Sequence, residues 1–241
     1  QYEEIVTCGG AWSNHIVAAA YACRLHGFKC TGIIRGEEPK HYSQTLQQAK
    51  EFGMHLHFIS RKEYAGKEGI SKHFSNAYFI PEGGYGLQGA AGASEILQCS
   101  TRYEKYSHIV CAVGTGTMMA GLIKAAANEQ QVMGISIMKG NNHEREVTAL
   151  LSDEDKAKRF SFCYGFHFGG YARHPAALIQ FMKNTWHQHQ LPTDIVYTSK
   201  TFFALQQLIA DDTIPAGSRV LMIHSGGLQG NASLPAGTLP F

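Results

Sequence analysis

Short apolar runs alternate with stretches of helical periodicity along this chain of 241 residues. The apolar runs predict strands at residues 5–8, 29–34, 55–59, 77–80, 108–113, 132–137 and 219–224. The stretches between them predict helices at residues 14–26, 43–52, 61–74, 87–97, 117–128 and 200–210, and one that contains residues 181–189 and could begin at Pro175. Strands that alternate with helices form parallel sheets covered on both faces. The pattern therefore predicts an α/β fold with mainly parallel sheets.

The strand and helix units fall into two sets. Residues 81–89 separate the sets and are rich in glycine. A chain of this length is long enough for two small domains. We therefore expect two three-layer αβα domains, a smaller one at residues 1–88 and a larger one at residues 89–241.

The composition excludes several classes of protein. Apolar residues make up 44% of the chain and the formal net charge is only +2, so the chain is not disordered as a whole. It contains no long basic run, so we expect no nucleic-acid partner. It also contains no apolar run near the roughly 18 residues of a membrane span, so we expect no membrane partner.

The cysteines and histidines indicate neither disulfides nor a metal site. The six cysteines are dispersed without a C-x-x-C pair, and no histidines show the spacing of zinc ligands. We expect buried reduced thiols, as in a cytoplasmic protein. The chain opens with polar Gln1 and has neither an initiator Met nor a signal peptide, so we expect a further N-terminal segment before it.

The first motif with possible chemistry is Gly-Gly-Ala-Trp-Ser-Asn-His at residues 9–15, between a predicted strand and a predicted helix. Ser13 or Asn14 can cap that helix. Free main-chain N–H groups at a helix N-terminus suit an anion such as a carboxylate. The alternative is an ordinary capped turn without a ligand.

The second motif is Val-Gly-Thr-Gly-Thr-Met at residues 113–118, again between a strand and a helix. Glycines let the backbone approach a ligand closely, Thr115 and Thr117 add hydroxyl groups, and the helix dipole favours a phosphate. The motif lacks the Gly-Lys-Ser/Thr of a P-loop, and Gly121 comes too late for G-x-G-x-x-G. We favour a phosphate-binding cup over a plain turn.

The third motif is His-Ser-Gly-Gly at residues 224–227, after the last predicted strand. Ligands of α/β proteins bind at the carboxyl ends of parallel strands, where the Ser225 hydroxyl could meet a ring nitrogen. A turn that merely ends the strand explains the motif equally well. Tyr171 and Tyr197 also lie near predicted loops, although isolated tyrosines more often serve in packing.

Five motifs together resemble one enzyme family. They lie in order at residues 9–15, 81–84, 113–117, 196–200 and 224–230. They are similar to those of the D-cysteine desulfhydrase and 1-aminocyclopropane-1-carboxylate (ACC) deaminase family, pyridoxal-phosphate (PLP) enzymes of the tryptophan-synthase-β type, also called fold type II. The resemblance covers nearly the whole chain. It implies PLP as cofactor, a small amino acid as substrate and a homodimer.

The resemblance also implies roles for individual residues. Ser13, Asn14 and His15 would bind the substrate carboxylate, and Asn14 would also contact the ring hydroxyl of the cofactor. Tyr171 and Tyr197 would line the substrate pocket and, with Ser13, act in catalysis. Ser225 would face the pyridine nitrogen with Thr198 beside it. The cofactor phosphate would be held by Gly114, Thr115, Gly116, Thr117 and Met118.

Thr198 and Ser225 distinguish the two branches of the family. ACC deaminases typically have Glu and Leu at these positions, and an ionised Glu would keep the pyridine nitrogen protonated. A hydroxyl does not, so the cofactor is a weaker electron sink, adequate for expelling thiolate but less suited to opening a cyclopropane. We therefore expect β-elimination from D-cysteine to pyruvate, ammonia and sulfide, with either tyrosine protonating the leaving group.

The lysine that binds the cofactor covalently in this family lies before the first strand, so we expect it upstream of Gln1. Lys29 is in the wrong place for that role. Lys200 matches a non-catalytic lysine, which we expect to be solvated.

Three alternatives remain open. The protein could be an ACC deaminase, or a truncated, non-catalytic module that binds PLP or another phosphate ligand. A generic Rossmann-like nucleotide-binding domain is disfavoured, because no acidic residue ends the next strand, where a ribose would be bound.

Overall fold

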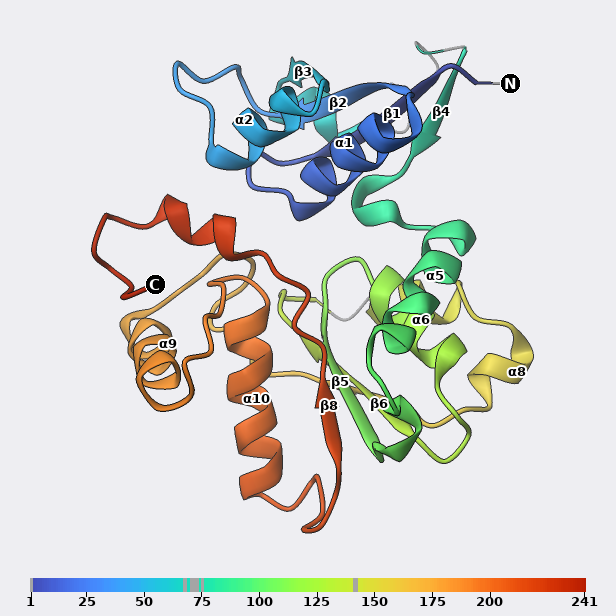
Figure 1. Cartoon of the computed structure of the whole chain (residues 1–241), viewed down its shortest axis with the longest axis vertical. Helices are drawn as coiled ribbons and strands as arrows, with labels where there is room; N and C mark the ends of the chain where they lie inside the picture. Colours follow the sequence, from blue (N-terminus) through green and yellow to red (C-terminus); the bar gives the residue numbers. More distant parts are fainter. Residues whose placement is uncertain (1, 67–68, 70–73, 75, 141–142) are drawn as a thin grey trace. The chain divides into compact units, whose positions relative to one another are not determined.

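A computed structural model describes residues 2–66, 69, 74, 76–140 and 143–241 of the chain. The chain divides into two compact units, Gln1–Gly84 and Tyr85–Phe241, and each contains its own four-stranded sheet (Figure 1). All strand pairs in both sheets are parallel. The predicted α/β class with parallel sheets is therefore confirmed. The units divide after Gly84, whereas the predicted boundary after residue 88 lies slightly later in the chain, inside helix α5 (Leu87–Ser94).

The first unit has the strand order β3-β2-β1-β4. Its strands are β1 (Glu4–Gly9), β2 (Lys29–Arg35), β3 (His55–Ile59) and β4 (Ala77–Ile80). Its helices are α1 (Asn14–His26), α2 (Gln44–Glu51) and α3 (Arg61–Ala65). Ile16 of α1 and Leu46 of α2 pack with Ile34 on one face of the sheet, and Tyr64 of α3 packs with Val6 on the other. The sheet is therefore the middle of three layers, as predicted.

Capping explains the bounds of α1. The Ser13 hydroxyl accepts a hydrogen bond from the Ile16 N–H at its start. Gly27 ends it in the left-handed conformation, with φ of 73°, and donates its N–H to the Arg24 carbonyl. Both signals are local in the sequence, and the predicted bounds of this helix are confirmed.

One predicted helix of the first unit is interrupted. A capping box between Ser60 and Glu63 starts α3, which ends at Ala65. Gly66 lies outside the helix, and Gly69 is again helical. Residues 67–68 and 70–73 of the prediction lie outside the described residues.

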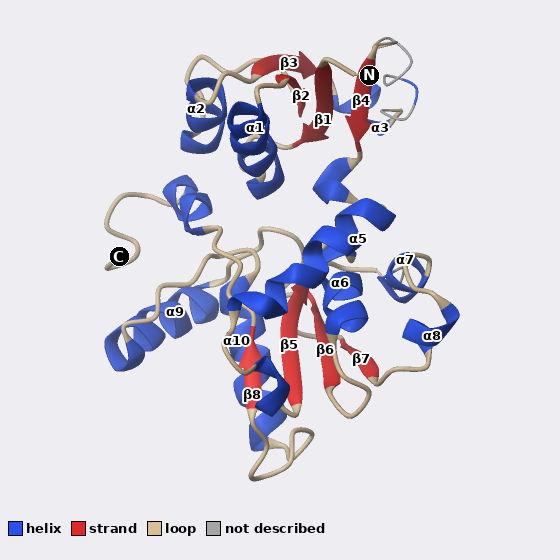
Figure 2. Ribbon diagram, turned by 45° about the vertical axis from the view of Figure 1, so that its right-hand side comes forward, coloured by secondary structure: helices blue, strands red, loops and turns tan. Residues whose placement is uncertain are grey.

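The second unit has the strand order β7-β6-β5-β8. Its strands are β5 (His108–Val113), β6 (Gln131–Ser136), β7 (Phe160–Cys163) and β8 (Val220–Met222). Its helices are α5, α6 (Thr117–Ala125), α7 (His143–Thr148), α8 (Asp153–Lys156), α9 (Ala176–His189) and α10 (Thr198–Ala210), as Figure 2 shows.

Helices cover both faces of this sheet as well. Leu122 of α6 and Ala90 of α5 pack with Ile109 on one face, and Ala204 of α10 packs with Val110 on the other. In Figure 1, α10 and α6 lie on opposite sides of β5. The second unit is therefore a three-layer structure, as predicted.

The sequence analysis missed several short elements of this unit. Strand β7 is only four residues long, and α7 and α8 have six and four residues. The predicted helix at 87–97 is α5 followed by a 3-10 helix at Glu95–Cys99. Such short segments carry at most two periods of a helical or strand pattern, so tertiary contacts largely determine them.

None of the six cysteines forms a disulfide. Cys99 is exposed, however, and Cys163 is half-buried, so the expectation of buried thiols is wrong for these two. Among the described residues, no helix combines the length and the apolar character that crossing a lipid bilayer requires.

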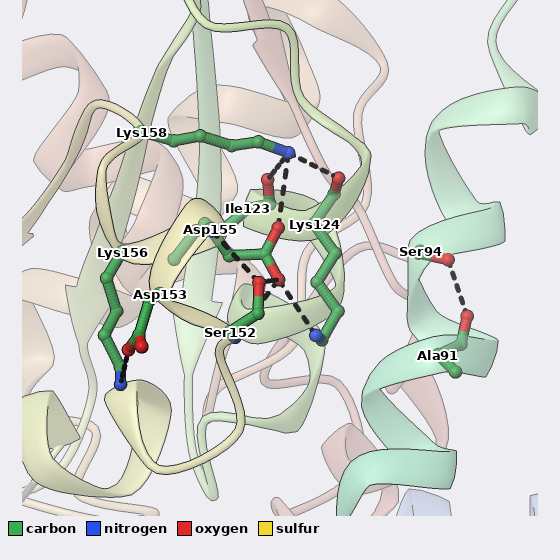
Figure 3. Close-up of polar contacts among 9 residues, drawn as sticks. All are labelled: Ala91, Ser94, Ile123, Lys124, Ser152, Asp153, Asp155, Lys156 and Lys158. Carbon is green, nitrogen blue, oxygen red and sulfur yellow. Dashed lines mark hydrogen bonds and ion pairs between the residues drawn. The ribbon is translucent and has the colours of Figure 1, made fainter.

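Ion pairs and hydrogen bonds around Asp155 connect α8 to the end of α6 (Figure 3). Lys124 Nζ lies 3.0 Å and Lys158 Nζ 3.4 Å from the Asp155 carboxylate, whose side chain is only 13% exposed. Lys158 Nζ also donates to the carbonyls of Ile123 and Lys124. These carbonyls lie at the end of α6, where a cation is favourable for the helix dipole.

We expect Asp155→Asn to lower the free energy of unfolding by about 1 kcal/mol at neutral pH, because it removes the charge but retains a capping oxygen. Burial alone would raise the pKa of Asp155, but hydrogen bonds from Lys124 and Ser152 lower it to about 2. The stabilisation is therefore present above the ordinary pKa of about 4 and is lost as the pH falls towards 2. Urea denaturation of both proteins across this range measures the difference.

Asp153→Asn is the matched control. Asp153 pairs with Lys156 on the same helix, but its side chain is 100% exposed. Solvent screens such a pair, so we expect no measurable change in stability. Equal effects of the two substitutions would contradict the proposed importance of the Asp155 cluster.

Candidate active site

The turn between β5 and α6 forms a cup of main-chain N–H groups. Gly116 is the N-cap residue of α6, and its helix start has no side-chain hydrogen bond of its own. The Oγ1 atoms of Thr115 and Thr117 lie 3.0 Å apart. Met118 packs against the hydrophobic core, so its main-chain N–H is the group it can offer to a ligand. Unsatisfied N–H groups, hydroxyls and the positive end of the helix dipole together suit a phosphate.

Only glycine fits at the centre of this cup. Gly116 has φ of 88°, and a Cβ atom there would lie 2.8 Å from Cγ2 of Val147 in α7. A larger residue would therefore have to adopt a strained backbone and displace α7. The close approach to Val147 explains why this turn requires glycine.

Two tyrosines adjoin the cup. A Cβ atom at Gly114 would lie 3.4 Å from Cε1 of Tyr197 and 3.9 Å from its hydroxyl. The rings of Tyr171 and Tyr197 meet edge to face, with centroids 6.3 Å apart and planes at 74°. The structure thus brings together Gly114, Tyr197 and Tyr171, which lie far apart in the sequence.

Strand β8 places Ser225 at the same edge of the sheet. Met222 of β8 pairs with Val110 of β5, and the Ile223 N–H donates to the Val110 carbonyl at 2.8 Å. Ser225 lies three residues beyond Met222, just as Val113, the last residue of β5, lies three residues beyond Val110. Ser225 therefore follows β8 at about the level where β5 ends and the cup begins. Ser225 is exposed.

His224 fixes the turn that carries Ser225. Its Nε2 lies 2.8 Å from the Pro192 carbonyl, which can only accept, so this nitrogen carries a proton. Its Nδ1 accepts the N–H of Gly226 at 3.4 Å. The two bonds define one neutral tautomer and tie the turn to the segment before α10.

Thr198, predicted beside the pyridine nitrogen, is buried and bonded to Asp194. Its hydroxyl donates to Asp194 Oδ1 at 2.7 Å and accepts the Asp194 N–H at 2.7 Å. The only hydroxyl proton of Thr198 is thus used in the bond to Asp194. Thr198 therefore has no proton left to donate to the unprotonated nitrogen of a ligand ring. Of the two predicted hydroxyls, Ser225 is the better placed to donate to a ligand.

The sequence analysis missed Asp194. Its carboxylate is buried and accepts the N–H groups of Val196, Tyr197 and Thr198 at 2.7–2.9 Å. It therefore caps α10 and orients the turn that carries Tyr197. An Asp four residues before Thr198, which lies just ahead of the helix predicted at 200–210, was the signal that could have revealed it.

The expectation that Lys200 is solvated is wrong. Its side chain is 0% exposed, and its Nζ donates to the carbonyls of His167 at 3.0 Å and Gly170 at 2.8 Å. Burial lowers the pKa of Lys200 to about 8, although the Asp194 carboxylate acts in the opposite direction. Its spacing of four from buried Ala204 was the missed signal, because it places Lys200 on the buried face of α10.

In the first unit, Ser13, Asn14 and His15 begin α1. The Ser13 hydroxyl caps the helix, and the Ser13 N–H donates to the Gly10 carbonyl at 3.0 Å. A Cβ atom at Gly9 would lie 2.8 Å from Ser13 Oγ, so the strand end must be glycine for this cap to form. The first turn presents main-chain N–H groups that suit a carboxylate.

The hydrogen bonds of His15 define its tautomer. Thr7 Oγ1 lies 2.8 Å from the Ile80 carbonyl, which can only accept, so the Thr7 proton points there. His15 Nε2, at 2.7 Å from Thr7 Oγ1, must then be the donor. Burial lowers the pKa of His15, while Glu82 acts in the opposite direction. The ring is neutral with Nδ1 as an acceptor, so a carboxylate would bind the main chain of His15 rather than its ring.

Comparisons with known proteins find relatives that align with most of the chain. A putative ACC deaminase of Thermotoga maritima is 28% identical over 248 residues, which cover 94% of this chain and 78% of that protein. A bifunctional D-cysteine desulfhydrase/ACC deaminase of Arabidopsis thaliana, described as mitochondrial, is 26% identical and aligns with 95% of this chain and 64% of its own length.

A solved structure described as an ACC deaminase homologue shares the fold. It superposes with a TM-score of 0.79 at 23% identity and covers 95% of this chain and 75% of that one. Residues 1–226 match the family model described as pyridoxal-phosphate dependent enzyme. The chain thus belongs to the family of pyridoxal-phosphate-dependent enzymes, as its five motifs predicted.

Proposed function

We propose that this protein eliminates the thiol of D-cysteine, so that D-cysteine and water give pyruvate, ammonia and hydrogen sulfide. The observation that carries the proposal is the exposed Ser225 at the carboxyl end of β8, beside the cup. A relative named for both D-cysteine desulfhydrase and ACC deaminase activity supports this choice of substrate class.

The residues of the second unit fit PLP. The cup at Gly114, Thr115, Gly116 and Thr117 offers N–H and hydroxyl groups for its phosphate. When bound, the cofactor supplies an electron sink for negative charge that develops at the substrate Cα. The Ser225 hydroxyl would donate to its pyridine nitrogen, which would then carry no positive charge. A weaker sink suffices for a good leaving group such as thiolate.

The remaining site residues bind the substrate and move protons. The role of the first turn of α1, at Ser13, Asn14 and His15, in binding the carboxylate through its N–H groups stays a prediction. The hydroxyl of Tyr197 or Tyr171 protonates the departing sulfur, and the edge-to-face contact holds the two rings together. A homodimer and a cytoplasmic location stay predictions.

ACC deamination is the second candidate, because several relatives carry that name. Thr198 and Ser225 disfavour it, since they replace the Glu and Leu that are typical of ACC deaminases.

With PLP and D-cysteine, we expect the full-length protein to release sulfide and pyruvate in equal amounts. A sulfide assay and coupled lactate dehydrogenase measure the two products, and ACC serves as the comparison substrate. If the protein turns over ACC but not D-cysteine, ACC deamination replaces D-cysteine elimination as the proposed activity. Bound PLP without turnover of either would favour the non-catalytic module.

We expect Ser225→Leu to lower kcat/KM for D-cysteine by about 2- to 10-fold, the range for losing a hydrogen bond between two neutral groups. Ser225→Thr keeps the hydroxyl and should retain most of the activity. Steady-state kinetics of the three proteins provide the test, and an unchanged rate in the Leu variant would remove Ser225 from the mechanism.

We expect Gly116→Ala to raise the dissociation constant of PLP by about tenfold or more, because it distorts the cup and costs it hydrogen bonds. Gly217→Ala is the matched control, since Gly217 has a similar φ of 82° but open space where a Cβ would lie. The control should lose about 1 kcal/mol of stability through strain and bind PLP normally. Absorbance titration measures binding, and equal affinities in both variants would argue against the cup.

A further inference from the structure

Lys200 occupies a position that is unfavourable for a cation on two counts. It is the third residue of α10, where the helix dipole repels positive charge. Its side chain is also 0% exposed, so its ammonium group has lost its hydration. A buried charge in such a place needs specific partners.

The partners of Lys200 are two carbonyls of one tight turn. Its Nζ donates to the carbonyls of His167 at 3.0 Å and Gly170 at 2.8 Å. The Gly170 N–H also donates to the His167 carbonyl at 3.0 Å, and the Gly169 N–H donates to His167 Nδ1 at 2.9 Å. Asp194, at the start of the same helix, supplies a negative charge nearby.

This turn needs support from other residues to keep its shape. Four of its residues have positive φ, namely Phe168 (53°), Gly169 (98°), Gly170 (125°) and Ala172 (54°). Two of the four carry side chains, for which this conformation is unfavourable. The ring of Phe168 contacts Phe203 of α10 edge to face, with centroids 5.0 Å apart. That contact anchors the turn without the ammonium group, so a variant of Lys200 can still fold.

We propose that Lys200 is a positioning residue that ties the turn at residues 167–172 to α10 and thereby holds Tyr171 against Tyr197. Tyr171 directly follows Gly170, whose carbonyl Lys200 binds. Tyr197 directly precedes α10, which carries Lys200. One buried side chain thus connects the supports of both tyrosines. The consequence for catalysis rests on the proposed function, whereas the ordering of the turn does not.

Trypsin cleavage after the exposed Arg173 tests the ordering of the turn directly. In Lys200→Met, a neutral side chain of similar length, we expect this cleavage to be about tenfold faster or more, because two hydrogen bonds from a charged group are lost. Mass spectrometry follows the cleavage at this site, and circular dichroism confirms that the protein is folded.

Lys158→Met is the matched control. Lys158 also donates to two main-chain carbonyls, those of Ile123 and Lys124, but at the end of α6. We expect the control to cleave after Arg173 at the wild-type rate. Wild-type cleavage in a folded Lys200→Met protein would overturn the proposal, as would equal acceleration in the control.

A choice of leaving group tests the catalytic consequence. D-cysteine is compared with β-chloro-D-alanine, whose chloride leaves without a proton. In Lys200→Met we expect kcat for D-cysteine to fall about tenfold or more, with little change for β-chloro-D-alanine, and Tyr171→Phe to show the same selectivity. Equal losses for both substrates would contradict a role in placing the tyrosines.

The two measurements separate the two claims. If the wild-type protein turns over neither substrate, the proposed function fails, while the trypsin experiment still decides the role of Lys200. If Lys200→Met does not fold, Lys200→Gln replaces it, because this polar side chain is easier to bury than a methionine beside two carbonyls but is uncharged and too short to bind both of them. Wild-type cleavage in the folded Gln variant would overturn the proposal.

Discussion

The parallel pairing of β5 with both β6 and β8 is the constraint on which the site of the second unit depends. Because neighbouring strands run in the same direction, their carboxyl ends meet at one edge of the sheet. The glycine cup follows β5, and Ser225 follows β8 at about the same level. Groups separated by about a hundred residues are thus brought to one place by main-chain hydrogen bonds alone.

Buried polar groups then orient the side chains at this edge. The Asp194 carboxylate accepts hydrogen bonds from the main-chain N–H groups at the start of α10 and so orients the turn that carries Tyr197. Lys200 binds the carbonyls of the turn that leads to Tyr171. Each charge is buried yet bonded, which makes the arrangement rigid and costly to disturb. In the first unit, the bonds from His15 through Thr7 to the Ile80 carbonyl do the same for the start of α1.

Sequence patterns predicted the elements with clear local signals. Helix α1 and the strands β3, β4 and β5 have the predicted bounds, because caps and apolar runs mark them. The glycine motif of the cup was recognisable for the same reason. The prediction failed for β7, a four-residue strand that is stabilised by pairing with β6, and for the end of α3. The proposed site roles of individual residues stay predictions.

The sequence by itself determined the α/β class, the parallel sheets and the family, since periodicity and short motifs are properties of neighbouring residues. Only the tertiary structure decided that Lys200 is buried, that the proton of Thr198 points to Asp194, and that Tyr171 meets Tyr197. The reason is physical. Burial and hydrogen-bond partners depend on contacts between distant segments, and these contacts exist only after the chain has folded.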